Sequence, residues 1–219
     1  MEAGSLLRPG WCIPKLSLRR PLPAFPLLAR PSLSNSQVDP QGVECQRVSP
    51  YLPDSAASEL EWFWESLSAV TCCRSLVVVY DNNCILQIGV AAESSKCGEA
   101  EAVDVAKLIQ GSLYQGIMNS GAQSYLTNLS LYPGKSELPF LPANAQGFSS
   151  IAGRMQEEAG SHLAVAGGKG ILIIAGDTVR GFISIDQAWI SLIGDKLDVT
   201  LSKLVPEEGR DKRFKLESP

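Results

Sequence analysis

Residues 76–90 read LVVVYDNNCILQIGV, and this stretch decides the fold. Two runs rich in β-branched and other apolar residues flank a polar DNN segment, which is the pattern of a β-hairpin. A two-residue turn at Asn82-Asn83 predicts that four apolar side chains are buried on one face of the sheet: Val77, Val79, Leu86 and Ile88. The other face is also mainly apolar, so we expect helices or a second subunit to cover both sides.

Apolar residues at helical spacing lie on both sides of the hairpin in the sequence. Asp54 is a suitable N-cap for a helix over 55–70, and a second helix is expected over 103–117. A third is expected over 184–204, where an S-x-x-Q capping box precedes the apolar stripe. These helices can supply the cover that the sheet requires.

Further strands are expected over 124–132, 171–175 and 179–183, the last two as neighbours joined by a tight turn. Residues 143–170 hold six glycines and are interpreted mostly as loop. The order of helices and strands predicts an α+β domain with an antiparallel sheet and flanking helices. A GAF/PAS-like sheet is the closest architecture.

Composition sets the domain boundaries. The chain of 219 residues has a net charge of −4, yet residues 1–36 carry five basic residues, one acidic residue and six of the 14 prolines. Such a segment is typical of an organelle transit peptide, and a merely disordered arm is the alternative. The prolines favour a chloroplast transit peptide over a mitochondrial one, which must be helical. We expect a linker at 37–53, a GAF-like domain at 54–205 with an irregular insertion at 143–170, and a disordered tail at 206–219.

The overall charge and hydropathy exclude some functions. The acidic balance disfavours general nucleic-acid binding, and no apolar run approaches the ~18 residues of a membrane-spanning helix. The chain has one histidine, His162, and no pair of cysteines has the C-x-x-C spacing of metal, thioredoxin-like or haem-attachment motifs. We therefore expect no metal site, no covalent c-type haem and no catalytic constellation in this chain.

The six cysteines are interpreted as free thiols that act as small hydrophobic residues in a reducing compartment. Cys72 and Cys73 are the exception that we keep open. Adjacent residues point to different faces of a helix or strand end, so one thiol can be buried while the other is available for exchange. These two residues are the possible redox thiols.

Trp62 lies off the apolar stripe of the helix over 55–70. It is either a partly exposed aromatic that covers a loop, or an anchor for a partner or a membrane interface. Because a sheet that is apolar on both faces needs cover, we expect a partner to contact Trp62 together with Tyr80 and Ile85.

Four segments carry a resemblance to a known family: GVECQRVSPYLPDS (42–55), RSLVVVYDNNCILQIGVAAES (74–94), GAQSYLTNLSLYPGKSELPFLP (121–142) and TVRGFISIDQAWISLIGDKLDVTL (178–201). Together they resemble the plant chloroplast CCB family, whose members act in cofactor assembly of complex C. The resemblance covers most of residues 40–205. It implies a chloroplast assembly factor with a GAF-like domain on the stromal side of the thylakoid membrane.

The resemblance also implies a task and partners. The task is to assist covalent attachment of the high-spin c-type haem to the cytochrome b subunit of the cytochrome b6f complex. The implied partners are a paralogous CCB subunit, other CCB proteins and that cytochrome. Family members carry two membrane-spanning helices before the GVECQ segment, whereas Asn35-Ser36-Gln37 leads there directly here. We therefore expect thylakoid contact through partners only, or a location in the soluble stroma.

Three hypotheses on function stay open. The leading one is a non-catalytic assembly factor with no resident cofactor, with transient haem contact left open. The alternative is a GAF-like domain that binds a small molecule and acts in regulation. The third is a thiol enzyme that uses Cys72 or Cys73, which would need a cationic partner such as Arg74 or His162.

Overall fold

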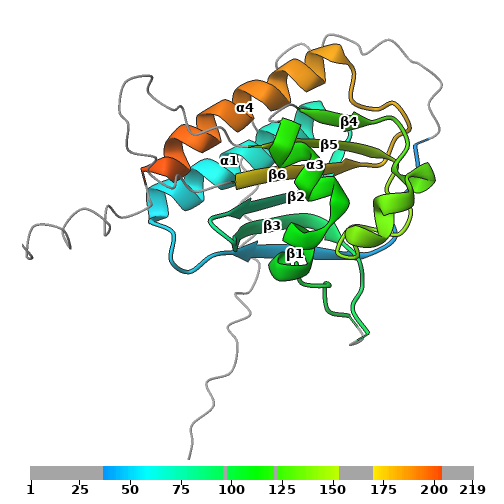
Figure 1. Ribbon diagram of the computed structural model, residues 1–219, viewed down its shortest axis with the longest axis horizontal. Coiled ribbons are helices and arrows are strands. Elements are labelled where there is room, and N and C mark those ends of the chain that lie inside the picture. Colours follow the sequence, from blue (N-terminus) through cyan, green and yellow to red (C-terminus); the bar gives the residue numbers. More distant parts are fainter. Residues whose placement is uncertain (1–36, 96–97, 121–122, 153–169, 204–219) are drawn as a thin grey trace, which may run out of the picture. The chain divides into compact units, whose positions relative to one another are not determined.

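The computed structural model describes residues 37–95, 98–120, 123–152 and 170–203. Six strands form one sheet in the order β1-β3-β2-β6-β5-β4, and every neighbouring pair is antiparallel (Figure 1). The strands are β1 (Val43–Val48), β2 (Cys73–Tyr80), β3 (Asn83–Ala91), β4 (Ser124–Leu126), β5 (Gly147–Ala152) and β6 (Gly170–Gly176). The expected α+β class, with an antiparallel sheet and flanking helices, is confirmed.

Helices cover both faces of this sheet, as Figure 1 shows. The helical elements are α1 (Asp54–Val70), α2 (Val105–Gln110), α3 (Ser112–Ser120), α4 (Ser184–Ser202) and two 3₁₀ turns at Leu129–Leu131 and Pro133–Glu137. Helices α1 and α4 bury Leu60, Phe63 and Ile193 against one face. Helix α3 and the segment after it bury Ile117, Leu129 and Phe140 against the other. The chain therefore supplies both covers itself, and a second subunit is not needed for them.

The β2–β3 hairpin exists, but its turn lies one residue earlier than the sequence suggested. Tyr80 pairs with Asn83, so the two-residue loop is Asp81-Asn82, and both loop residues have positive φ, 47° and 60°. Asp and Asn tolerate this conformation, which suits the twist of a hairpin. A bulge between Val78 and Val79 then shifts the pairing.

The predicted facing of the hairpin side chains is consequently wrong. Val78 lies opposite Leu86 and Leu76 opposite Ile88, and these four side chains pack on the α1/α4 face. Val77 and Val79 pack on the α2/α3 face. The prediction that Val77, Val79, Leu86 and Ile88 are buried is nevertheless confirmed, since each is at most 7% exposed.

Helix ends show three differences from expectation. Pro53, not Asp54, is the N-cap of α1, and Asp54 begins the first turn without a side-chain cap bond. The capping box of α4 is also displaced, because the Asp186 carboxylate accepts a hydrogen bond from the backbone N–H of Ile183 at 3.2 Å. Val70, placed on the buried stripe by its spacing, is 52% exposed at the last turn of α1.

Two of the expected boundaries are wrong. Residues 37–53 are no mere linker, because Val43–Val48 form edge strand β1 on β3. Residues 147–152 are no irregular insertion, because they form β5 between β6 and β4. The strand was not predicted because serine is not typical of a buried strand, yet Ser149 and Ser150 are fully buried in the sheet.

The strand expected over 179–183 is absent, and the strand expected over 124–132 is limited to Ser124–Leu126. Both edges of β6 are already occupied by β2 and β5, so no site remains for a partner at 179–183. Expectations that fall on 1–36, 153–169 and 204–219, including His162 and the transit peptide, lie outside the described residues. None of the helices within the described ranges is both long and apolar enough to cross a membrane.

Candidate functional site

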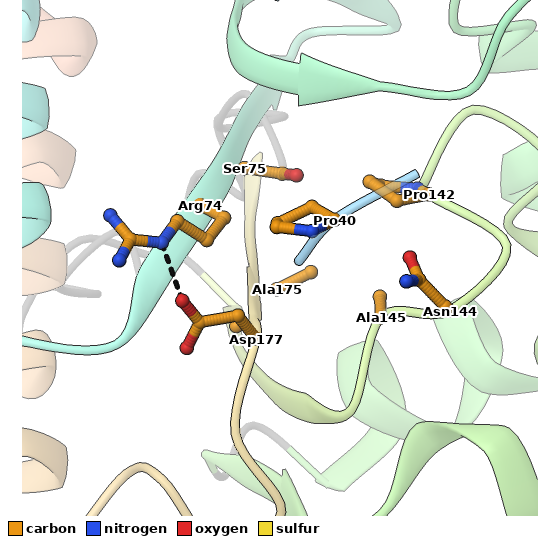
Figure 2. A pocket seen from close by; sticks show the side chains of 9 residues that line it. Pro40, Arg74, Ser75, Pro142, Asn144, Ala145, Ala175 and Asp177 are labelled. Carbon is orange, nitrogen blue, oxygen red and sulfur yellow. Dashed lines mark hydrogen bonds and ion pairs between the residues drawn. The ribbon is translucent and has the colours of Figure 1, made fainter. Parts of the chain in front are cut away.

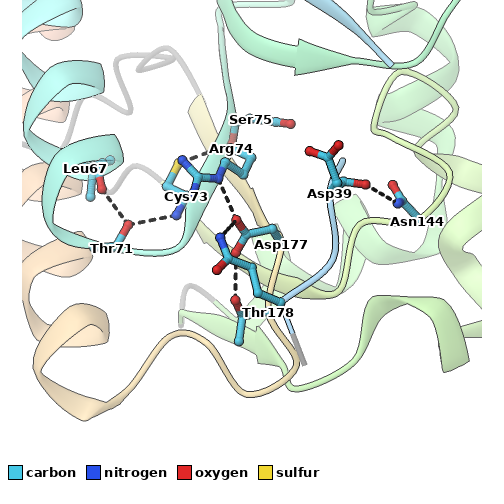
Figure 3. Close-up of polar contacts among 10 residues, drawn as sticks. Asp39, Leu67, Thr71, Cys73, Arg74, Ser75, Asn144, Asp177 and Thr178 are labelled. Carbon is cyan, nitrogen blue, oxygen red and sulfur yellow. Dashed lines mark hydrogen bonds and ion pairs between the residues drawn. The ribbon is translucent and has the colours of Figure 1, made fainter. Parts of the chain in front are cut away.

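Asp177, directly after β6, is the centre of a buried polar network (Figure 3). Its side chain is 2% exposed, and its Oδ2 accepts a hydrogen bond from Arg74 Nε at 2.6 Å and from Gln37 Nε2 at 3.0 Å. Thr178 Oγ1 donates to the other carboxylate oxygen at 2.7 Å. A buried carboxylate is tolerated because both of its oxygens are paired.

This network holds the segment that leads into β1. The backbone N–H of Val38 donates to the carbonyl of Asp177 at 2.9 Å, and Asn144 Oδ1 accepts a hydrogen bond from the Gln41 N–H at 2.8 Å. Asn144 Nδ2 also donates to the carbonyl of Asp39 at 2.7 Å. We call residues 37–41 the strap, because these bonds tie them across β6 and the loop before β5.

The strap fills the hollow beneath it. Pro40 lies among the labelled side chains of Arg74, Ala175 and Pro142 in Figure 2. The remaining space does not admit a water-sized group. This site therefore acts as an attachment for the chain that precedes the sheet, and it offers no room for a small-molecule ligand.

The two candidate redox thiols flank this network but are inaccessible. Cys72 is 6% exposed and Cys73 is fully buried, so the expectation that one of them faces solvent is wrong. Burial raises the pKa of the Cys73 thiol far above its usual range, which disfavours the reactive thiolate. Thr71 causes this geometry, because its Oγ1 donates to the carbonyl of Leu67 and accepts from the Cys73 N–H, which turns the chain inward after α1.

Trp62 lies on the outer side of α1 and is 49% exposed. Lys196 of α4 lies 5.8 Å from its ring centroid and pairs with Glu59 at 2.7 Å. This hydrogen bond from Lys196 lowers the pKa of the Glu59 carboxyl, with a smaller contribution from Thr200. The aromatic ring, the cation and the carboxylate together join the outer sides of α1 and α4.

An exposed apolar line continues from this point along α4. Its side chains are spaced seven residues apart and are 76%, 61% and 55% exposed: Ile185, Leu192 and Val199. Lys196, whose ammonium contacts the Trp62 ring, lies between the last two at i+4 and i−3 spacing, so it shares their side of α4. We call Trp62 and these three side chains the outer α1/α4 surface, because they lie on the side of the helices that faces away from the sheet. Exposed apolar side chains gathered on one face are typical of protein contact sites.

The other two partner-contact candidates are placed differently from Trp62. Tyr80 is 5% exposed and belongs to the core between the sheet and α4, so its ring cannot serve as an exposed anchor. Ile85 is half-buried beside the same core. Neither residue lies with Trp62 on the outer side of the helices. Contact of Tyr80 or Ile85 with a partner therefore stays a prediction.

Sequence reasoning missed the residues that organise these sites. Local pattern marks Asp177 only as a turn residue, and its partners Arg74 and Gln37 lie 103 and 140 positions away. Contacts over such separations leave no local signal. In the part of the chain that the structure describes, no three His, Cys, Asp or Glu side chains are grouped as metal ligands would be.

The family model for cofactor assembly of complex C, CCB2/CCB4, matches residues 23–197. The chain belongs to this family. Across 170 residues it is 54% identical to the chloroplastic cofactor-assembly protein of complex C named CCB4, from Arabidopsis thaliana. That match covers 78% of this chain and 53% of the relative, so the chain spans about half the length of that CCB protein. The resemblance that the four sequence segments carried, nearest to the fourth CCB subunit, is confirmed.

Two solved structures match this chain at low similarity. One is a type II free methionine-R-sulfoxide reductase from Thermoplasma acidophilum, at 16% identity and a TM-score of 0.44, covering 69% of this chain and 95% of that one. The other is the GAF domain of a phosphoenolpyruvate-protein phosphotransferase from Coxiella burnetii, at 14% identity and a TM-score of 0.42, covering 74% and 99%.

Proposed function

We propose that this chain is a non-catalytic assembly factor of the chloroplast that assists cofactor attachment to a membrane complex. The observation that carries the proposal is the CCB2/CCB4 family match over residues 23–197, with 54% identity to a chloroplastic relative. The cargo we propose is the high-spin c-type haem, and its acceptor is the cytochrome b subunit of the cytochrome b6f complex.

The described side chains support a role in contact rather than catalysis. The buried Asp177 carboxylate is fully engaged in holding the strap, and the buried thiol of Cys73 has a raised pKa. We therefore propose no catalytic residue and no resident cofactor. Transient contact with haem is the second possibility, and the absorbance of protein incubated with haem and then desalted distinguishes the two.

The outer α1/α4 surface is the site that we propose for contact with a paralogous CCB protein. Trp62 supplies a large ring whose position is fixed by Lys196 and by an edge contact with Phe63 at 5.4 Å. Rigid aromatic side chains of this kind dominate the affinity of many interfaces. The strap lies elsewhere, at Asp177. Its hydrogen bonds attach residues 37 and 38 to the end of β6.

The alternative function, a regulatory domain that binds a small molecule, is less well supported. On the α2/α3 face, the described side chains leave no evident room for such a ligand. Leu129, Phe140 and Phe148 are each at most 2% exposed and fill that layer. For location we propose the stromal side of the thylakoid membrane, reached through partners, or the soluble stroma.

Co-purification from chloroplasts tests the proposal. A tagged form of this chain should recover the paralogous CCB protein and the cytochrome b apoprotein, and a Tyr51→Ser control with an exposed aromatic removed elsewhere should recover them equally. If the tagged chain accumulates in chloroplasts and recovers neither protein, the proposed function is wrong.

A further inference from the structure

A small hollow opens between the ends of β2 and β6 and the last turns of α4. Apolar side chains line most of it, among them Val78, Leu172, Leu197 and Leu201. Gly170 and Gly194 also line it and contribute no side chain to fill it. The space free of protein atoms, with the solvent in its open mouth included, is about 290 Å³, and the hollow itself admits about one water-sized group.

Two polar atoms in this hollow have no partner. Tyr80 is 5% exposed, and its hydroxyl makes no hydrogen bond. Oδ1 of Asp198 is equally inaccessible and equally unpaired. Buried polar groups are nearly always hydrogen-bonded, so two orphaned atoms in one hollow indicate that a further group belongs there.

The charges around the hollow are negative. Burial and, after it, the neighbouring Asp195 raise the pKa of the Asp198 carboxyl. Burial and the charges of Asp198 and Asp81 likewise raise the pKa of the Tyr80 hydroxyl. Lys196, the closest lysine along α4, is paired with Glu59 instead. A group that carries both hydrogen-bond donors and positive charge would satisfy this site better than water.

We propose that this hollow binds a primary ammonium group on a short apolar stem. The ammonium, which is about the size of the one water that the hollow admits, donates to Asp198 Oδ1 and to the Tyr80 hydroxyl oxygen, and the stem leaves through the open mouth along Leu197 and Leu201. Both a lysine side chain of another protein and a free alkylamine have this chemistry. Binding here is independent of the haem-attachment role proposed above.

The test uses the full chain, labelled with ¹⁵N, and two probes of equal size. Titration with n-butylammonium should shift the amide signals of Gly170 and Gly194 saturably, whereas neutral n-butanol should leave them unchanged. Asp198→Asn should weaken n-butylammonium binding at least tenfold, and Tyr80→Phe should weaken it less. Asp195→Asn, which removes an exposed charge on the same helix, should retain most of the affinity.

The source of the ammonium group is decided in the same titration. A blocked Gly-Lys-Gly peptide that binds at least as well as n-butylammonium assigns the site to a protein lysine, and a peptide that fails to bind assigns it to a free amine. Equal shifts with n-butanol, or binding unchanged in Asp198→Asn with a native spectrum, would show that the hollow holds water only and would overturn the proposal.

Discussion

Arg74 Nε and Asp177 Oδ2 lie 2.6 Å apart although 103 positions separate the two residues in the sequence. Arg74 keeps 40% of its side chain exposed, whereas Asp177 keeps 2%. The exposed arginine can be solvated when its partner is lost, but the buried carboxylate depends on its donors. The network around Asp177 is thus what fixes the strap to the sheet.

Asp177→Ala should release the strap. The change removes the acceptor for Arg74, Gln37 and Thr178 and should lower the free energy of unfolding by about 1–3 kcal/mol. Urea denaturation measures this loss, and hydrogen exchange should show faster exchange at the Val38 amide. Asp39→Ala is the matched control, because only the backbone of Asp39 is bonded, and it should change neither.

Val79→Asp should unfold the domain. Val79 is 1% exposed in the core under α2 and α3, and an unpaired charge there should cost about 3 kcal/mol or more. Leu131→Asp, at a position 79% exposed, should leave the melting temperature nearly unchanged. A Val79→Asp protein with the melting temperature of the parent would show that Val79 is not buried in the folded domain.

The thiols of Cys72 and Cys73 should resist labelling in the folded protein. Both side chains are buried, and burial raises the pKa of Cys73, so the reactive thiolate is scarce at neutral pH. Iodoacetamide labelling followed by peptide mass spectrometry should modify both only after unfolding in urea. Equal labelling rates with and without urea would restore the redox hypothesis.

Trp62→Ser should weaken the proposed pairing with a paralogous CCB protein by about 1–3 kcal/mol and leave the fold intact. The ring is half exposed, so its loss costs little in the isolated domain. Calorimetric titration of the purified partners measures the change. Tyr51→Ser, at a residue 93% exposed, should pair with unchanged affinity. If both variants pair like the parent, Trp62 is only a surface aromatic.

The stability of the domain should fall as pH rises through the titration of Asp198. Burial, and then Asp195, raise its pKa in the folded state, so the folded protein binds the proton more tightly than the unfolded chain. This contribution is fully present below the unfolded pKa and is lost as pH passes the folded one. Asp198→Asn should flatten this part of the profile of melting temperature against pH. A variant profile parallel to that of the parent would contradict the assignment.

Local patterns in the sequence predicted the elements but not their pairing. The helix over 55–70 and the two apolar runs of the hairpin were correctly assigned, because their periodicity follows from burial. The hairpin register was missed because a bulge at Val78/Val79 adds a residue that no spacing rule reveals. Strand β5 was missed because its central residues, Ser149 and Ser150, are polar. Composition alone predicts that such residues are exposed, whereas both are buried.

The sites were less predictable than the fold. Trp62 stood out because it lies off the apolar stripe of its helix, which is a local signal. Asp177 and Asp198 become informative only through Gln37, Arg74 and Tyr80, which the folded sheet brings to them. Such long-range contacts depend on topology and are invisible in a single sequence.

The central claim is that this chain assists haem attachment to the cytochrome b subunit. The most direct measurement is haem staining of a denaturing gel of thylakoid membranes from a plant line that lacks its own CCB4-type protein and expresses this chain. We expect a restored covalent haem band at the cytochrome b position, and a weaker band with Trp62→Ser at equal protein level. No haem band, although the chain accumulates in chloroplasts at the level of the missing protein, would contradict the claim.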